Sequence, residues 1–124
     1  LMVGHFLPPD RDPAGAFQWY RKALAPGSYL AVSHLASDLA PVNSAGIVET
    51  LRRHQIEVFP RTRAEVSALV LGDDFEWVAP EQFPLEPATP ELVTTSRWRP
   101  DHGDSYPANP DEDGLYAGVA RKPS

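Results

Sequence analysis

Two short apolar runs on either side of a helix signal constrain the fold more than any other feature of this chain. Residues 1–7 form an apolar run without alternation, which is typical of a strand covered on both faces. A second run covers residues 28–35. Between them, Asp12 suits a helix N-cap, Pro13 suits the first helical position, and Pro26-Gly27 ends the helix. Strand, helix and strand in this order predict a parallel pair joined by a helical crossover.

The rest of the chain continues this alternation. A second helix is predicted with Asn43 or Ser44 as its cap, and a third with Thr62 and Glu65 as a capping box and Gly72 as its stop. Further strands are predicted over residues 75–79 and 115–120. Apolar side chains at helical spacing form the predicted buried stripes of the first two helices: Phe17, Tyr20, Leu24, Ile47, Val48 and Leu51.

The sequence therefore predicts an α/β fold with an incomplete doubly wound sheet. Its strands are expected in the spatial order first, second, fourth, third. The sheet is expected to be mostly parallel, with the last two strands as an antiparallel pair, because no helix separates them. Residues 81–114 are rich in proline and acidic side chains and are predicted to be a long loop with little secondary structure.

Composition excludes several classes of function. Eleven basic residues against seventeen acidic ones give a net charge of −6, which disfavours nucleic acid as a partner. The chain has no cysteine, so disulfides and zinc-thiolate sites are excluded. No apolar run approaches the roughly 20 residues of a membrane span. A cytoplasmic location is therefore expected.

Four segments carry a resemblance to a known family: Ala25-Pro26-Gly27-Ser28-Tyr29-Leu30-Ala31-Val32-Ser33-His34, Arg61-Thr62-Arg63-Ala64-Glu65-Val66, Trp98-Arg99-Pro100-Asp101 and Tyr116-Ala117-Gly118-Val119-Ala120-Arg121-Lys122-Pro123. Together they resemble a class I S-adenosyl methyltransferase family, formerly a domain of unknown function. The resemblance implies S-adenosylmethionine as the cofactor and a small molecule as the methyl acceptor. The aromatic-aromatic-Asp-Gly turn expected near residues 71–74 is absent.

The resemblance also implies that residues 1–124 are one partial domain, the carboxyl-terminal half of a Rossmann-like sheet. The missing half would supply the glycine-rich turn and the acidic residue that holds the ribose. We expect either that half or a second copy of this chain as a partner, because the first strand has lost a neighbour. The alternative is a non-enzymatic assembly or regulatory module that pairs through its exposed first strand.

Candidate site residues follow from the rule that ligands of open α/β sheets lie outside the carboxyl ends of the strands. Gly4, His5 and Phe6 end the first strand and are predicted to bind the cofactor. His34 ends the second strand, and it and His5 are candidates for a general base. Either histidine can instead be a hydrogen-bonded structural residue. No metal site is predicted, because the two histidines lack a third ligand.

Acceptor-binding residues are predicted on the same edge and on the segments that follow it. Ser33 lies beside His34, and Arg61 and Arg63 suit a clamp on a carboxylate or phosphate. Trp98 and Arg99 suit a cover over a planar acceptor. The arginines can alternatively form a solvated helix start, and the pair Trp98 and Arg99 can instead fix the long loop to the sheet.

Overall fold

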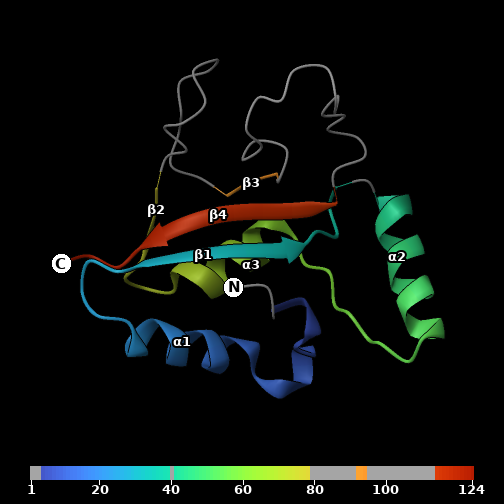
Figure 1. Ribbon diagram of the computed structural model, residues 1–124, viewed down its shortest axis with the longest axis horizontal. Helices are drawn as coiled ribbons and strands as arrows, with labels where there is room; N and C mark the ends of the chain where they lie inside the picture. The colour runs from blue at the N-terminus through green and yellow to red at the C-terminus, as the bar shows by residue number, and fades with distance from the viewer. Residues whose placement is uncertain (1–3, 40, 79–91, 95–113) are drawn as a thin grey trace, which may run out of the picture.

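The sheet is organised around its last strand, β4 (Leu115–Arg121), in a computed structural model that describes residues 4–39, 41–78, 92–94 and 114–124. Strand β1 (Tyr29–Leu35) pairs with β4 over its whole length. The other edge of β4 is shared by two short strands, β2 (Glu76–Trp77) and β3 (Val93–Thr94). All three pairings are antiparallel. Figure 1 shows β1 and β4 side by side, with the helices below and at one end.

The predicted spatial order of the second, fourth and third strands is confirmed by the order β1-β4-β2. The prediction of a mostly parallel sheet is wrong for the described strands. β1 and β2 do run in the same direction, since both are antiparallel to β4, and helices connect them. However, β4 returns without a crossover helix and lies between them, so no two of the paired strands are parallel.

The first apolar run does not form the predicted strand where it is described. Residues Gly4–Phe6 form a short 3-10 helix, η1, while residues 1–3 lie outside the described part. The Leu7 amide donates to the Gly4 carbonyl at 3.0 Å and closes the turn, and the His5 carbonyl accepts from the Phe59 amide at 2.6 Å. These carbonyls are bonded within the turn and to another loop, so they do not form a strand ladder.

Helix α1 (Pro13–Ala23) has the predicted start, preceded by the short 3-10 helix η2 (Pro9–Arg11). The Asp12 side chain accepts from the Gly15 amide at 3.1 Å, and Pro13 is the first helical residue. The carboxyl end of α1 is bonded to a residue that follows β4. The Lys122 ammonium donates to the carbonyls of Arg21 and Leu24 at 2.8 and 2.7 Å. A cation at a helix carboxyl terminus also interacts favourably with the helix dipole.

Helices α2 (Pro41–Arg53) and α3 (Arg63–Leu71) follow β1. In α3 the predicted capping box is confirmed: Thr62 Oγ1 accepts from the Glu65 amide at 3.2 Å, and Glu65 Oε1 accepts from the Thr62 amide at 3.1 Å. Gly72 ends this helix with φ of 53°. The predicted cap of α2 at Asn43 or Ser44 is wrong, because the helix already begins at Pro41, a residue type that suits the first turn.

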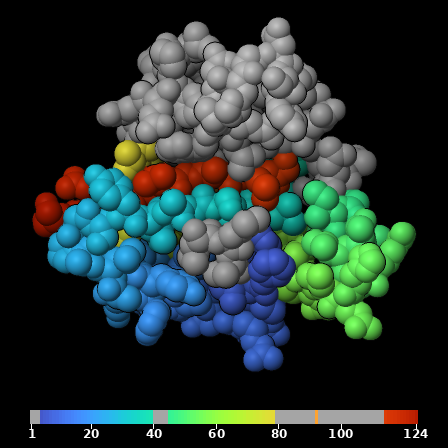
Figure 2. Space-filling model, viewed as in Figure 1, coloured from blue at the N-terminus to red at the C-terminus, as the bar shows by residue number. Residues whose placement is uncertain are grey.

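The core lies between the sheet and helices α1 and α3. Its buried side chains come from α1, β1, α3, β4 and the segments beside them: Phe17, Val32, Ala36, Val66, Val70, Phe75, Leu92, Tyr116 and Ala120. In α1, Phe17 is 1% exposed, as predicted, but Tyr20 is 36% exposed. In α2, Ile47 is 40% exposed, so neither predicted stripe is wholly buried. Figure 2 shows the side chains of α2 at one end of the molecule.

Residues 81–114 contain an element that the sequence did not reveal. β3 pairs with β4 through Val93 opposite Ala117 and Thr94 opposite Tyr116, and Leu92 beside it is 2% exposed. Thus β2 and β3 occupy the same edge of β4, with residues 78–92 between them.

Trp98 and Arg99 lie outside the described residues. Within the described ranges, no helix is long and apolar enough to cross a membrane.

Candidate functional site

Two clusters of polar side chains lie near the carboxyl end of β1. The first, which we call the histidine–arginine cluster, contains His5, His34 and Arg61. The second, which we call the tyrosine–aspartate cluster, contains Asp38, Arg63 and Tyr116. The carboxyl ends of strands are where open α/β sheets bind their ligands, so this edge is the candidate site.

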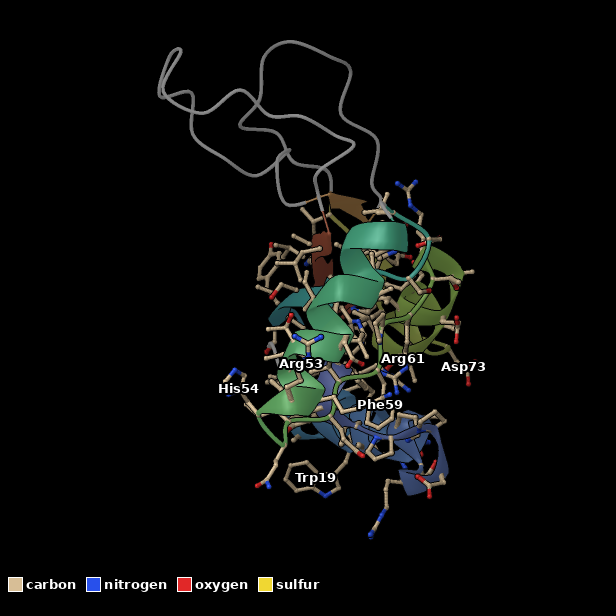
Figure 3. The ribbon with its side chains drawn as sticks, turned by 90° about the vertical axis from the view of Figure 1, so that its right-hand side faces the viewer. Trp19, Arg53, His54, Phe59, Arg61 and Asp73 are labelled. Atoms are coloured by element: carbon tan, nitrogen blue, oxygen red, sulfur yellow. The ribbon has the colours of Figure 1, made fainter. Side chains whose placement is uncertain are left out.

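Arg61 connects three segments that are far apart in the sequence. Its Nη1 donates to the Gly4 carbonyl at 2.7 Å and to His34 Nε2 at 3.0 Å, and its Nη2 donates to the Leu7 carbonyl at 2.6 Å. Its backbone amide bonds to Leu35 at the end of β1. Figure 3 shows Arg61 beside Phe59, between α3 and the segment that leads into α1. Arg61 therefore fixes η1 to the carboxyl end of β1.

The guanidinium of Arg61 is not available to bind the methyl acceptor. The residue is 6% exposed, burial lowers its pKa, and its hydrogen bonds go to two carbonyls and an imidazole of the same chain. The predicted anion clamp is therefore not what Arg61 forms in this structure. The sequence placed Arg61 at an exposed helix start, and only the tertiary structure turns it inward.

His34 is fully buried, and both of its ring nitrogens have partners. Because an arginine can only donate, Nε2 is the acceptor and Nδ1 donates to the Leu35 carbonyl at 2.8 Å. Burial first, and then the Arg61 charge, lower the pKa of His34 to about 4, although the bond to Leu35 opposes this shift. His34 is thus neutral at pH 7. The geometry favours the structural role, and the predicted role as a general base has no free ring nitrogen to support it.

His5 differs from His34 in one respect that matters for ligand binding. It is 6% exposed, and its Nδ1 has no hydrogen-bond partner within the part of the chain that the structure describes. Its ring lies edge-on to His34, with centroids 5.6 Å apart, and 4.4 Å from the ring of Phe6, which is 50% exposed. Burial and the Arg61 charge lower the pKa of His5. The result is a neutral imidazole with an unpaired nitrogen beside a half-exposed aromatic ring.

Gly4 is buried for a reason that involves no ligand. A Cβ atom at this position would lie 2.8 Å from His34 Cδ2 and 3.0 Å from Phe17 Cζ. The sequence predicted that this glycine allows a ligand to approach the backbone. In the structure, the side chains that approach it belong to β1 and α1.

The tyrosine–aspartate cluster was missed by the sequence analysis. The Tyr116 hydroxyl donates to Asp38 Oδ1 at 2.6 Å, and the Arg63 amide donates to Asp38 Oδ2 at 3.1 Å. The Arg63 guanidinium lies over the Tyr116 ring, 5.5 Å from its centroid. Burial, followed by the Asp38 contact, raises the pKa of Tyr116 to about 12. The same strand-end rule that selected His34 could have selected Asp38, which lies three residues after β1.

These contacts make Asp38 a poor base and Tyr116 a poor nucleophile. Hydrogen bonds from Tyr116 and the Arg63 amide lower the pKa of Asp38 despite its partial burial.

Arg63 itself is exposed, and its guanidinium is available at the edge of the sheet. Ser33, also predicted to contact the acceptor, is half-buried on β1. Among the described residues, no three metal-binding side chains are grouped for an ion.

A surface cavity of about 340 Å³ lies on the helical side of the molecule. Its lining is mostly apolar, with Arg61 and Glu65 as the charged members: Pro9, Pro13, Phe59, Pro60, Arg61, Glu65, Ala68 and Leu69. Both charged side chains already bond within the chain, Arg61 to η1 and Glu65 to the start of α3.

Comparison with known proteins decides the family. A family model described as S-adenosyl methyltransferase matches residues 1–123. The chain belongs to the S-adenosyl methyltransferase family. The family implies S-adenosylmethionine as its cofactor. None of the curated proteins matches the chain.

Two solved structures are similar to this one. A DUF574 family protein from Streptomyces avermitilis is 24% identical with a TM-score of 0.79, and a proposed methyltransferase from Thermobifida fusca is 32% identical with a TM-score of 0.73. Each comparison covers 99% of this chain, but only 43% and 42% of those two chains. The chain therefore spans less than half the length of these structures.

Proposed function

We propose that this chain is part of a class I S-adenosylmethionine-dependent methyltransferase that transfers a methyl group to a small molecule. The observation that carries the proposal is the family match over residues 1–123. Because the chain spans less than half of its structural relatives, the activity is that of a larger, Rossmann-like domain to which residues 1–124 contribute. A cytoplasmic location fits this activity.

The histidine–arginine cluster is the proposed cofactor side of the site. His5 Nδ1 is a buried ring nitrogen without a hydrogen-bond partner among the described residues, which is the type of group that a polar ligand atom satisfies. Phe6 offers an aromatic face beside it, 50% exposed. Gly4 contributes indirectly, because its missing side chain lets η1 pack on His34 and Phe17.

The charge state of these residues suits a cationic methyl donor. Bound S-adenosylmethionine would supply an activated methyl group on a sulfonium. His5 and His34 are both kept neutral by burial and by Arg61, so neither adds an imidazolium beside that charge. Arg61, the one buried cation among the described residues, has its N–H groups directed at carbonyls and at His34. The protein's role is therefore to position the reactants, which carries much of the catalysis in such a displacement.

The acceptor side of the site is proposed at Arg63 and Ser33. The Arg63 guanidinium is exposed and rests on the Tyr116 ring, and this contact restricts its orientation. A planar guanidinium held in this way suits a carboxylate or phosphate on the acceptor. Trp98 and Arg99 remain proposed acceptor residues on the basis of the sequence alone.

The proposed site is incomplete with these residues alone. None of the eight glycines forms a G-x-G-x-x-G turn. In class I enzymes such a turn and a following acidic residue hold the nucleoside of the cofactor. We therefore expect the 124-residue chain by itself to bind S-adenosylmethionine more weakly than about 1 μM, which corresponds to about −8 kcal/mol.

Calorimetric titration tests the proposal in two steps. The 124-residue chain is titrated with S-adenosylmethionine, and then a polypeptide that joins it to the remaining part of the domain is titrated. Weak binding to the first and micromolar binding to the second is the expected result. Micromolar binding to the chain alone would contradict the incomplete site. No binding to the joined polypeptide, and no transfer of labelled methyl to any small molecule, would contradict the methyltransferase.

Matched variants of the joined polypeptide locate the cofactor side. His5→Phe removes the unpaired Nδ1 but keeps a ring, so we expect about a fivefold loss of S-adenosylmethionine affinity, since one hydrogen bond contributes about 1 kcal/mol. His54→Phe, at an exposed histidine after α2, is the control and should leave the affinity unchanged. Equal affinities for both variants would remove His5 from the site.

The alternative function, an assembly module that pairs through its first strand, has no observation in its favour. It required an extended edge over residues 1–6, and Gly4–Phe6 instead form the turn η1. The predicted homodimer through the same strand loses its support for the same reason. The missing part of the domain remains the proposed partner.

A further inference from the structure

Arg61 is fixed at both ends, through its backbone and through its side chain. Its amide donates to the Leu35 carbonyl at 3.0 Å, and its carbonyl accepts from the Ser37 amide at 2.9 Å. Arg61 also forms an isolated parallel bridge with Ala36. The backbone of Arg61 is therefore tied to the carboxyl end of β1, and the side chain extends from a fixed point.

The guanidinium of Arg61 is bonded to both ends of η1. Nη1 donates to the carbonyl of Gly4, the first residue of η1, and Nη2 donates to the carbonyl of Leu7, the residue after it. The Leu7 amide also donates to the Gly4 carbonyl, so the guanidinium holds the turn where it closes. His5 and Phe6 lie between the two bonded carbonyls, and their place relative to β1 therefore depends on Arg61.

Two further contacts limit the position of His5. Nη1 of Arg61 donates to His34 Nε2 at 3.0 Å, while His34 Nδ1 is bonded to the Leu35 carbonyl. Bonds at both ring nitrogens fix the tautomer and the orientation of an imidazole. The His5 ring packs edge-on against this ring, with centroids 5.6 Å apart. The Phe59 amide, two residues before Arg61, adds a bond to the His5 carbonyl at 2.6 Å.

These contacts use the guanidinium in a way that an ammonium group does not reproduce. Two nitrogens of the planar fork bond three acceptors at once, and the side chain is buried. A lysine ammonium is a single point on a flexible stem, and it loses its proton more readily when it is buried. Replacing Arg61 with lysine therefore removes the fork while the side chain keeps its length and its basic character.

We infer that Arg61 is a positioning residue of the cofactor side, which places His5 and Phe6 by holding η1 and His34 and does not itself touch the cofactor. This inference rests on the proposed function, because it takes His5 and Phe6 as cofactor contacts. Binding groups need such a supporting residue, because small displacements of the groups that touch a ligand weaken binding. Arg61 should therefore change cofactor affinity through the geometry of its neighbours.

Calorimetric titration of the joined polypeptide with S-adenosylmethionine tests this inference. Arg61→Lys is compared with Val70→Ala, which truncates a fully buried side chain of α3 that is not part of the histidine–arginine cluster. Because both variants lose stability, a difference in their affinities has another cause. We expect Arg61→Lys to bind about tenfold more weakly than the unchanged protein, or weaker still. Val70→Ala should bind within about twofold of the unchanged protein.

A double-variant cycle tests whether Arg61 acts through His5. His5→Phe alone is expected to weaken binding about fivefold, so independent effects of His5→Phe and Arg61→Lys would multiply to about fiftyfold. We expect a smaller combined loss, nearer to about tenfold, because one of the groups that Arg61 positions is already absent. A combined loss equal to the product would show that the two residues act independently and would overturn the inference.

Two other results would overturn it. One is equal affinity of Arg61→Lys and Val70→Ala, whether both bind normally or both bind weakly. The other is loss of the fold, measured by circular dichroism, in Arg61→Lys and also in Arg61→Gln, because Arg61 would then be a structural residue only. Arg61→Gln replaces Arg61→Lys in the titrations if it alone folds.

The failure of this inference differs from that of the proposed function. Binding to the unchanged joined polypeptide that Arg61→Lys tolerates contradicts only the positioning role. No binding to the unchanged joined polypeptide contradicts the methyltransferase, and the positioning role is lost with it.

Discussion

The histidine–arginine cluster and helix α2 are both polar in sequence, but the fold treats them in opposite ways. In the cluster, Arg61 is 6% exposed and His34 is 0% exposed. Arg61 is hydrogen-bonded to His34, Gly4 and Leu7 at 2.6 to 3.0 Å. In α2, residues 45–53 include no buried side chain. The first region exists because distant segments meet, while the backbone hydrogen bonds of the second close within one helix. The same kind of mutation should therefore have different effects in the two regions.

The largest difference is expected when an arginine is removed from each region. Arg61→Met leaves His34 Nε2 and the carbonyls of Gly4 and Leu7 without their donor, so we expect a loss of about 3 kcal/mol in the free energy of unfolding. Arg53→Met in α2 removes only an exposed contact with Glu49 at 3.6 Å and should cost less than about 0.5 kcal/mol. Urea unfolding of both variants measures this. Equal losses would show that the cluster contributes no more than the helix surface.

Lowering the pH should weaken the contribution of the histidine–arginine cluster to the free energy of unfolding and leave that of α2 unchanged. The folded-state pKa of His34, about 4, lies below its unfolded value near 6.5, so protonation favours the unfolded chain. Its contribution is fully present above pH 6.5 and is lost as the pH falls towards 4, by on the order of 3 kcal/mol. His5, whose pKa is also lowered, acts in the same direction. Unfolding free energies between pH 7.5 and 4.5 should fall steeply in the unchanged protein.

Two histidine variants separate this effect from the titration of carboxylates. His34→Gln should flatten the pH dependence between 6.5 and 4.5, whatever its cost at pH 7.5. His54→Gln, at an exposed histidine that follows α2, should leave the pH dependence unchanged. A steep fall that persists in His34→Gln would assign it to other groups.

A methyl group added to a glycine should destabilise the cluster. In Gly4→Ala the new Cβ would lie 2.8 Å from His34 Cδ2 and 3.0 Å from Phe17 Cζ. Both neighbours are buried and cannot move away freely, so we expect a loss of about 2 kcal/mol, a typical cost of overpacking. Thermal and urea unfolding measure it. An unchanged midpoint would mean that η1 can shift without loss, contrary to the tight packing described above.

A glycine-to-alanine substitution in α2 should stabilise the protein. This is the smallest of the expected effects, and its sign is opposite to that of Gly4→Ala. Gly46 lies inside the helix, and a Cβ there would meet no atom within 4 Å. Alanine favours a helix over glycine by about 0.5–1 kcal/mol, so Gly46→Ala should raise the unfolding free energy by that amount. A decrease would indicate that α2 is packed against something, and the contrast between the two regions would then disappear.

The local elements were predictable because their signals are contained within a few residues. The Asp12 cap, the Thr62–Glu65 capping box and the Gly72 stop each involve neighbours in sequence, and each is present. Short apolar runs likewise located β1 and β4, and the helices between the runs predicted the crossover between β1 and β2. Such features depend on backbone groups at helix ends and on side-chain periodicity, which a sequence displays directly.

Only the tertiary structure decided the character of the candidate site. Arg61 lies inward because the carbonyls of Gly4 and Leu7, more than fifty residues earlier, need donors, and its presence sets the tautomer and the low pKa of His34. η1 is a turn rather than a strand for the same reason. The bond between Asp38 and Tyr116 spans 78 residues. The sequence by itself determined the ends of α1 and α3, because the hydrogen bonds there close within a few residues. The roles of the site residues depend on partners that no local pattern specifies.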